Sequence, residues 1–123
     1  MKKIVVIWAS NNREKYGNKI VKDLISKWFD AIPVNPKENK IEWIESFKSL
    51  SDITDDYDAV TFVIRPDIWL KILEENTDVL INKKIWFQPW ASNENIVSYL
   101  QENNFSDYIT DSCIMLDTLK NES

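Results

Sequence analysis

The sequence predicts an α/β fold of three layers, in which an open parallel sheet of about five strands carries helices on both faces. Two observations support this prediction. Short runs of apolar, mostly β-branched residues alternate with segments of about 10–15 residues that have helical periodicity, which is typical of right-handed βαβ units. The runs are apolar throughout, as in strands that are buried on both faces of a sheet. The length of 123 residues fits a single domain.

The first strand and the first helix carry the clearest signals. Residues 4–7 form the run Ile-Val-Val-Ile, and we expect this strand in the centre of the sheet. After a polar loop, residues 17–27 are expected to form a helix. Its apolar side chains form one stripe, made of Ile20, Val21, Leu24 and Ile25.

The later elements continue the alternation. Further strands are expected at residues 31–34, 59–64, 84–88 and 108–109, with 113–115 as an additional candidate. Pro66 suits the first turn of a helix, and Ser92 suits the N-cap of another. Residues 37–57 are expected to be irregular, apart from a short strand near residues 44–47 and a helical turn at residues 50–53. The domain is expected to comprise residues 1–116, followed by a polar, frayed tail, 117–123.

Composition excludes several classes of function. The net charge of −5 argues against binding nucleic acid through a basic surface. The absence of histidine removes histidine-based nucleophile systems, histidine metal sites and phosphohistidine chemistry. A single cysteine allows no intrachain disulfide and suggests a reducing, cytoplasmic compartment. The longest apolar run, residues 4–9, is far shorter than the roughly 20 residues of a membrane span. We also do not expect this run to be a leader peptide, because no convincing cleavage site comes after it.

The balance of glycine and tryptophan is abnormal. The chain has one glycine where average usage of about 7% predicts roughly nine, and it has six tryptophans. Only Trp86 lies in an expected core strand. Of the other five, Trp8 and Trp90 lie in turns between a strand and a helix, and Trp28 lies just past a helix. Trp43 lies in the irregular segment, and Trp69 lies within a helix. We therefore expect these five to be glycines in the native protein. Some genetic codes translate UGA as glycine and others as tryptophan, so translation of the gene with the wrong code would produce this pattern.

Several segments resemble the small, single-domain CoA-binding proteins. The first loop, from Trp8-Ala9-Ser10 to Gly17, is similar to a family loop that starts with Gly-Ala-Ser. The run Trp86-Phe87-Gln88-Pro89-Trp90-Ala91 resembles the family's Trp-x-Gln-x-Gly-Ala pattern. Further matches lie at residues 34–36, 49–53 and 111–115, so that the resemblance covers about residues 3–116. The chain departs from the family's glycines at Trp8, Trp28, Trp43 and Trp90.

The resemblance implies a Rossmann-like fold, similar to the CoA-binding domain of the succinyl-CoA synthetase α subunit, and a site for coenzyme A at the carboxyl ends of the strands. The CoA diphosphate would lie over residues 10–15, the adenosine near residues 34–36 and 64–66, and the thiol arm near residues 88–90. The candidate binding residues are Trp8, Ala9, Ser10, Asn12, Arg13, Lys15, Tyr16, Gly17, Val34, Asn35, Pro36, Ile64, Arg65, Pro66, Gln88, Pro89, Trp90 and Cys113.

The chemistry of these residue types fits part of that assignment. Arg13 and Lys15 suit phosphate groups, and Ser10 and Asn12 offer hydrogen-bond donors. Cys113 either forms a mixed disulfide with the CoA thiol or is a small buried apolar residue. No metal ligands and no catalytic residues are expected.

Three functions remain open at this point. The first is a non-enzymatic protein that binds CoA or acyl-CoA. The second is a small NAD(P)- or nucleotide-binding regulatory protein, although no acidic residue ends the second strand and no G-x-G-x-x-G motif is present. The third is a protein-interaction domain, which would follow if Trp8 and Trp90 fill the pocket. A protein partner is not identified by the sequence, and neither nucleic acid nor a membrane is an expected partner.

Overall fold

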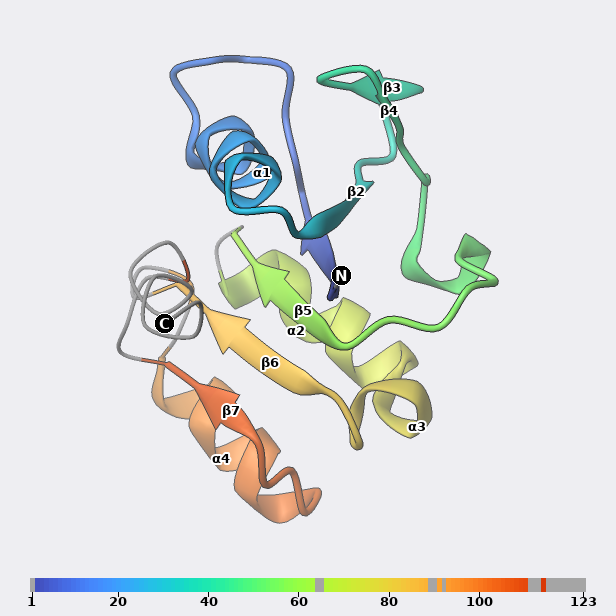
Figure 1. Cartoon of the computed structure of the whole chain (residues 1–123). Coiled ribbons are helices and arrows are strands. Elements are labelled where there is room, and N and C mark those ends of the chain that lie inside the picture. The colour runs from blue at the N-terminus through green and yellow to red at the C-terminus, as the bar shows by residue number, and fades with distance from the viewer. Residues whose placement is uncertain (1, 64–65, 89–90, 92, 111–113, 115–123) are drawn as a thin grey trace.

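A parallel five-stranded sheet forms the centre of the molecule (Figure 1). The computed structural model describes residues 2–63, 66–88, 91, 93–110 and 114, with the backbone alone at residues 66–69. The strands have the order β2-β1-β5-β6-β7, and each neighbouring pair is parallel. They are β1 (Lys3–Ile7), β2 (Asp30–Val34), β5 (Ala59–Phe62), β6 (Lys84–Phe87) and β7 (Tyr108–Ile109). The predicted parallel sheet is confirmed. β1 is an inner strand, but it lies second from one edge, and β5 holds the central place that was expected for β1.

The chain lays β2 on one side of β1 and β5 on the other, so the strand order reverses beside β1. The connection that leaves the carboxyl end of β1 leads to β2 on one side, and the connection that leaves the carboxyl end of β5 leads to β6 on the other side. Because these two connections leave in opposite directions, a crevice opens between them at the carboxyl edge. This places the expected ligand site at the ends of β1 and β5.

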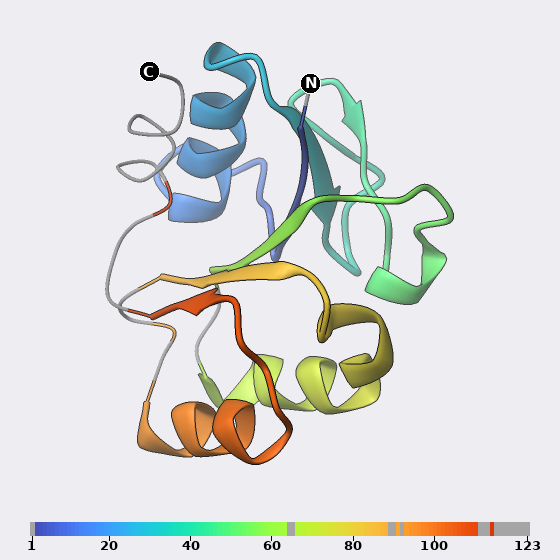
Figure 2. The ribbon, with the colours of Figure 1, turned by 60° about the horizontal axis from the view of Figure 1, so that its bottom comes forward.

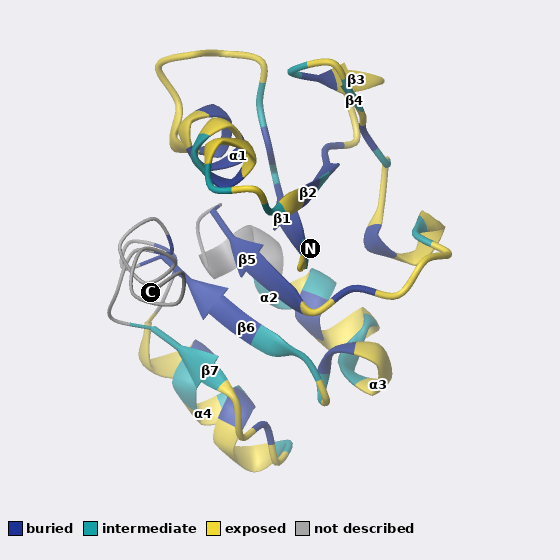
Figure 3. Ribbon diagram, in the orientation of Figure 1, coloured by how far each residue is buried: buried dark blue, intermediate teal, exposed yellow. Residues whose placement is uncertain are grey.

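Helices cover both faces of the sheet (Figure 2). Helix α1 (Tyr16–Ser26) packs on one face, and α2 (Pro66–Glu75), α3 (Thr77–Leu80) and α4 (Glu94–Glu102) pack on the other. Successive side chains of β1 alternate between the two layers. Ile4 and Val6 lie in the core with α1, whereas Val5 and Ile7 lie in the core with the other helices. Both layers need apolar contacts, so the four apolar residues of β1 are buried (Figure 3).

The segment between β2 and β5 is more ordered than predicted. It contains an antiparallel hairpin of β3 (Lys40–Ile41) and β4 (Ile44–Glu45). The expected strand at residues 44–47 is thus cut to two residues, and Phe47 makes only an isolated bridge to Val34. The expected helical turn is confirmed as a 3-10 helix, Leu50–Asp52.

Two details of the later chain were predicted wrongly. Helix α4 is capped by Asn93, whose Oδ1 accepts a hydrogen bond from the Ile96 amide at 3.0 Å, and not by Ser92, which lies outside the described residues. The additional strand at residues 113–115 is not supported, because Ile114, its one described residue, is helical. None of the described helices is both long and apolar enough to span a membrane.

Candidate ligand-binding site

An open cleft of about 460 Å³ lies at the carboxyl end of β1, at the point where the strand order reverses. Its walls come from the β1–α1 loop, the first turn of α1, the segment after β2 and the residue after β5. The lining residues are Trp8, Ser10, Glu14, Lys15, Tyr16, Gly17, Asn35, Lys37, Glu38 and Val63. The cleft therefore occupies the position at which open α/β sheets bind ligands.

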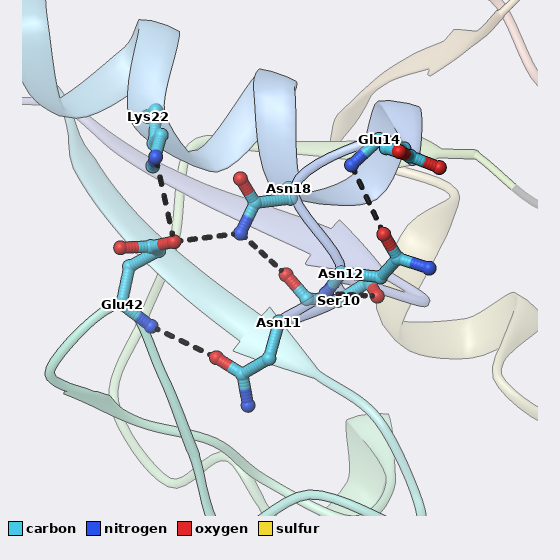
Figure 4. Close-up of polar contacts among 7 residues, drawn as sticks. All are labelled: Ser10, Asn11, Asn12, Glu14, Asn18, Lys22 and Glu42. Atoms are coloured by element: carbon cyan, nitrogen blue, oxygen red, sulfur yellow. Dashed lines mark hydrogen bonds and ion pairs between the residues drawn. The ribbon is translucent and has the colours of Figure 1, made fainter.

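Hydrogen bonds within the β1–α1 loop hold one wall of the cleft (Figure 4). Ser10 Oγ accepts a hydrogen bond from the Asn12 amide, and Asn12 Oδ1 accepts one from the Glu14 amide, each at 3.0 Å. The Asn18 side chain donates to the Ser10 carbonyl and to Glu42 Oε1, each at 2.8 Å. The loop is thus fixed to α1 and to the β3–β4 hairpin by its own polar groups. The side-chain oxygens of Ser10 and Asn12 therefore hold the conformation of the loop itself.

Asn35 connects the ends of β1 and β2. Its Nδ2 donates to the Ala9 carbonyl at 2.7 Å, and its Oδ1 accepts from the Lys37 amide at 2.8 Å. The amides of Trp8 and Ala9 both donate to the Val34 carbonyl. Asn35 is buried, and both ends of its side-chain amide are engaged. It therefore positions the loop that forms the cleft.

Gly17 allows α1 to approach the end of β1. A Cβ atom at this position would lie 2.5 Å from the Trp8 carbonyl oxygen and 3.2 Å from the Ala9 Cα. Both are backbone atoms, so no side-chain rotation can relieve the contact. The first turn of α1 consequently packs closely against the loop that lines the cleft.

The charges around the cleft are mixed. Lys15 and Lys37 line it together with Glu14 and Glu38. Helix α1 has no side-chain cap and no acidic residue in its first turn, so the positive end of its dipole is not compensated there. Helix α4, in contrast, begins with the Asn93 cap and Glu94. An anion near Lys15 would be stabilised by both the lysine and the helix end.

Glu42 supports the loop from outside the cleft. The hydrogen bond from Asn18 is the main cause that lowers the pKa of its carboxyl group, and the charges of Lys22 and Arg13 add to this effect. Lys22 Nζ lies 3.7 Å from the carboxylate. Arg13, predicted to contact phosphate, is exposed and does not line the cleft in this conformation.

Trp8 also lines a second cavity. The residue is half-buried and borders both the cleft described above and another cavity of about 360 Å³, whose lining includes Ile7, Val34 and residues 48–51. Trp8 has a φ angle of 70°, in the left-handed region. The residue that follows β1 is thus shared by two cavities at the same edge of the sheet.

The structure brings together six of the predicted site residues, which are Trp8, Ser10, Lys15, Tyr16, Gly17 and Asn35. Ala9 and Val34 are buried beneath them, and Asn12 and Pro36 are exposed nearby without lining the cleft. Gln88 is buried, and its Oε1 accepts a hydrogen bond from the Ile114 amide at 2.9 Å.

Some predicted residues are not tested, and some lining residues were not predicted. Ile64, Arg65, Pro89, Trp90 and Cys113 lie outside the described residues, and only the backbone of Pro66 is described. The unpredicted lining residues are Glu14, Lys37, Glu38 and Val63. Glu14 lies within residues 10–15, which were expected to hold the diphosphate, and Lys37 directly follows residues 34–36, so their charge was an available signal.

The parallel sheet and the cleft at its carboxyl edge define an open α/β domain of the class that binds ligands at this edge. Residues 2–118 match the CoA binding domain family, and the chain belongs to that family. An ADP-forming acetate–CoA ligase from Methanocaldococcus jannaschii is 35% identical over 74 residues. The match covers 60% of this chain and 10% of the ligase, so the chain corresponds to a small part of that enzyme.

Solved structures have the same fold over nearly the whole chain. A conserved hypothetical protein from Pyrococcus furiosus has a TM-score of 0.88 and 38% identity, and covers 95% of this chain and 99% of its own. A hypothetical protein from Pyrococcus horikoshii has a TM-score of 0.84 and 25% identity, and covers 97% of this chain and 82% of its own. Both likenesses support the α/β assignment made from the sequence.

Proposed function

We propose that this chain is a non-enzymatic protein that binds CoA or acyl-CoA in the cleft at the carboxyl end of β1. Membership of the CoA binding domain family carries the proposal. The position of the cleft at the reversal of strand order supports it. The chain matches only a tenth of the acetate–CoA ligase and contains no histidine, so we assign it binding and no phosphoryl transfer.

The groups around the cleft fit the diphosphate of CoA. Lys15 and Lys37 supply positive charge, and the uncapped first turn of α1 adds its dipole. Glu14 and Glu38 oppose a polyanion, so we place the diphosphate at Lys15 and the start of α1, where the dipole adds to the charge of the lysine. The pantetheine arm would then extend along the sheet edge past position 8.

A thermal-shift series tests the ligand class. CoA and acetyl-CoA are expected to raise the midpoint of unfolding of this chain, because a ligand that binds only the folded state stabilises it by mass action. NAD and NADP serve as the matched dinucleotides. A shift with NAD or NADP and none with CoA would favour the regulatory nucleotide-binding protein, and no shift with any of them would contradict both proposals.

Lys15→Glu is expected to weaken CoA binding about fivefold at low salt, because Lys15 is exposed and its charge is partly screened. The difference from the parent chain should shrink as salt is added. Lys2→Glu makes the same charge change at the opposite end of β1 and should leave affinity nearly unchanged. Titration calorimetry of both variants, in the parent and in a Trp8→Gly background, measures the effect. Equal affinities for the two variants would contradict the placement of the diphosphate.

A further inference from the structure

Three tryptophans hold backbone conformations that favour glycine. Trp8, Trp28 and Trp43 have φ angles of 70°, 67° and 72°. Among the residues that the structure describes, the other positive φ angles belong to Glu42 and Asn104, and Gly17 has none. A positive φ is a genuine outlier for a bulky side chain, because Cβ then crowds the backbone. The single glycine of the chain thus occupies none of these left-handed positions.

Trp28 occupies the position that ends a helix in a Schellman motif. Its amide donates to the Ile25 carbonyl at 3.1 Å, and the Phe29 amide donates to the Leu24 carbonyl at 2.9 Å. These are the two hydrogen bonds of the motif, whose left-handed residue is usually glycine and sometimes asparagine. Helix α4 ends with the same pattern, and there the left-handed residue is Asn104. One chain therefore shows the motif once with a suitable residue and once with tryptophan.

Trp43 lies in the two-residue turn between β3 and β4. Glu42 and Trp43 both have positive φ, as in a type I′ turn. This turn favours asparagine or aspartate followed by glycine, because both of its central residues need a positive φ. Tryptophan again stands at the position of the glycine.

The side chains at these turns give little packing in return. The indoles of Trp28 and Trp43 are 80% and 95% exposed, so neither buries enough apolar surface to offset a strained backbone. Trp86 differs in every respect, because it is 3% exposed, lies in β6 and packs in the core beside α1.

We infer that positions 8, 28 and 43 are glycine in the protein that the source cell makes, encoded by UGA codons which that cell translates as glycine. Trp86 remains tryptophan. Position 90 lies outside the described residues, and position 69 lies in α2, where helical backbone makes no demand for glycine. The exposed indoles are then not an interaction surface.

Peptide masses of the protein from its source cells test the inference directly. Trypsin releases residues 28–37 and 41–48, each with one of the positions in question, and residues 85–120, which hold both position 86 and position 90. We expect glycine masses for the first two peptides, and fragmentation of the third should show tryptophan at position 86. Tryptophan masses at positions 28 and 43, or UGG codons in the gene, would overturn the inference.

Stability measurements on the chain that carries tryptophan at position 28 give an independent test. Trp28→Gly is expected to raise the midpoint of thermal unfolding by about 4 °C, as relief of a left-handed residue should. Trp28→Ala, which removes the indole but keeps Cβ, should give no such rise, and Asn104→Gly should change the midpoint much less. An equal rise for glycine and alanine at position 28 would contradict the requirement for glycine. None of these measurements involves CoA, so they stand apart from the proposed function.

Discussion

Replacing Gly17 with alanine is expected to lower the free energy of unfolding by about 1–3 kcal/mol, although alanine is the better helix former. The added Cβ would lie 2.5 Å from the Trp8 carbonyl oxygen, so either α1 or the end of β1 must move. Interiors are packed too densely to absorb such a shift without loss of contacts. Denaturant unfolding of the parent and the variant measures the difference.

Lys19→Ala is the matched control for this substitution. It introduces alanine two residues further along the same helix, at an exposed position. Its effect on the free energy of unfolding should stay within about 0.5 kcal/mol. If Gly17→Ala instead stabilised the chain, helix propensity would outweigh the close approach, and the packing of α1 on the cleft loop would be looser than the distances indicate.

The central sheet could be predicted because its signal is local. Residues 4–7 of β1 must all be apolar, since alternate side chains enter two different core layers. The β3–β4 hairpin gave no such signal, because its strands have only two residues each. Its turn was also hidden, since Trp43 occupies the position at which glycine would have marked a type I′ turn.

The detail of the site depends on contacts that no local pattern contains. Asn35 looks like part of an Asn-Pro turn, and its bond to the Ala9 carbonyl, 26 residues away, appears only in three dimensions. Gly17 is similar, because its requirement comes from the Trp8 carbonyl. The N-cap of α4 could not be chosen from the sequence, since Ser92 and Asn93 are adjacent and both suit the position.

Trp8 is the position at which the proposed function and the inference about glycine meet. Trp8 is the one described residue that lines both cavities at the carboxyl edge, and its φ of 70° suits glycine. Glycine there would remove a large side chain from this shared position and is expected to open a path from one cavity to the other. An elongated ligand such as CoA needs a continuous path from the helix end at Lys15 along the sheet edge.

Trp8→Gly is therefore expected to tighten CoA binding by about 10- to 100-fold, equivalent to roughly 1.4–2.7 kcal/mol. The parent must displace the indole or bind CoA partially, whereas the variant offers the space already open. Titration calorimetry with CoA measures the gain. Thermal unfolding without ligand should also show a higher midpoint for the variant, because the backbone at position 8 is relieved.

Two further variants separate the causes. Trp8→Ala opens the same space but keeps Cβ, so it should recover most of the affinity and little of the stability. Trp28→Gly relieves the turn after the C-terminal end of α1, which does not line the cleft. This variant should raise stability and leave CoA affinity unchanged. A stabilised Trp8→Gly variant that binds CoA no better than the parent would contradict the proposed path of the ligand and leave the inference about glycine intact. Better binding without added stability would support the path of the ligand and count against glycine at position 8.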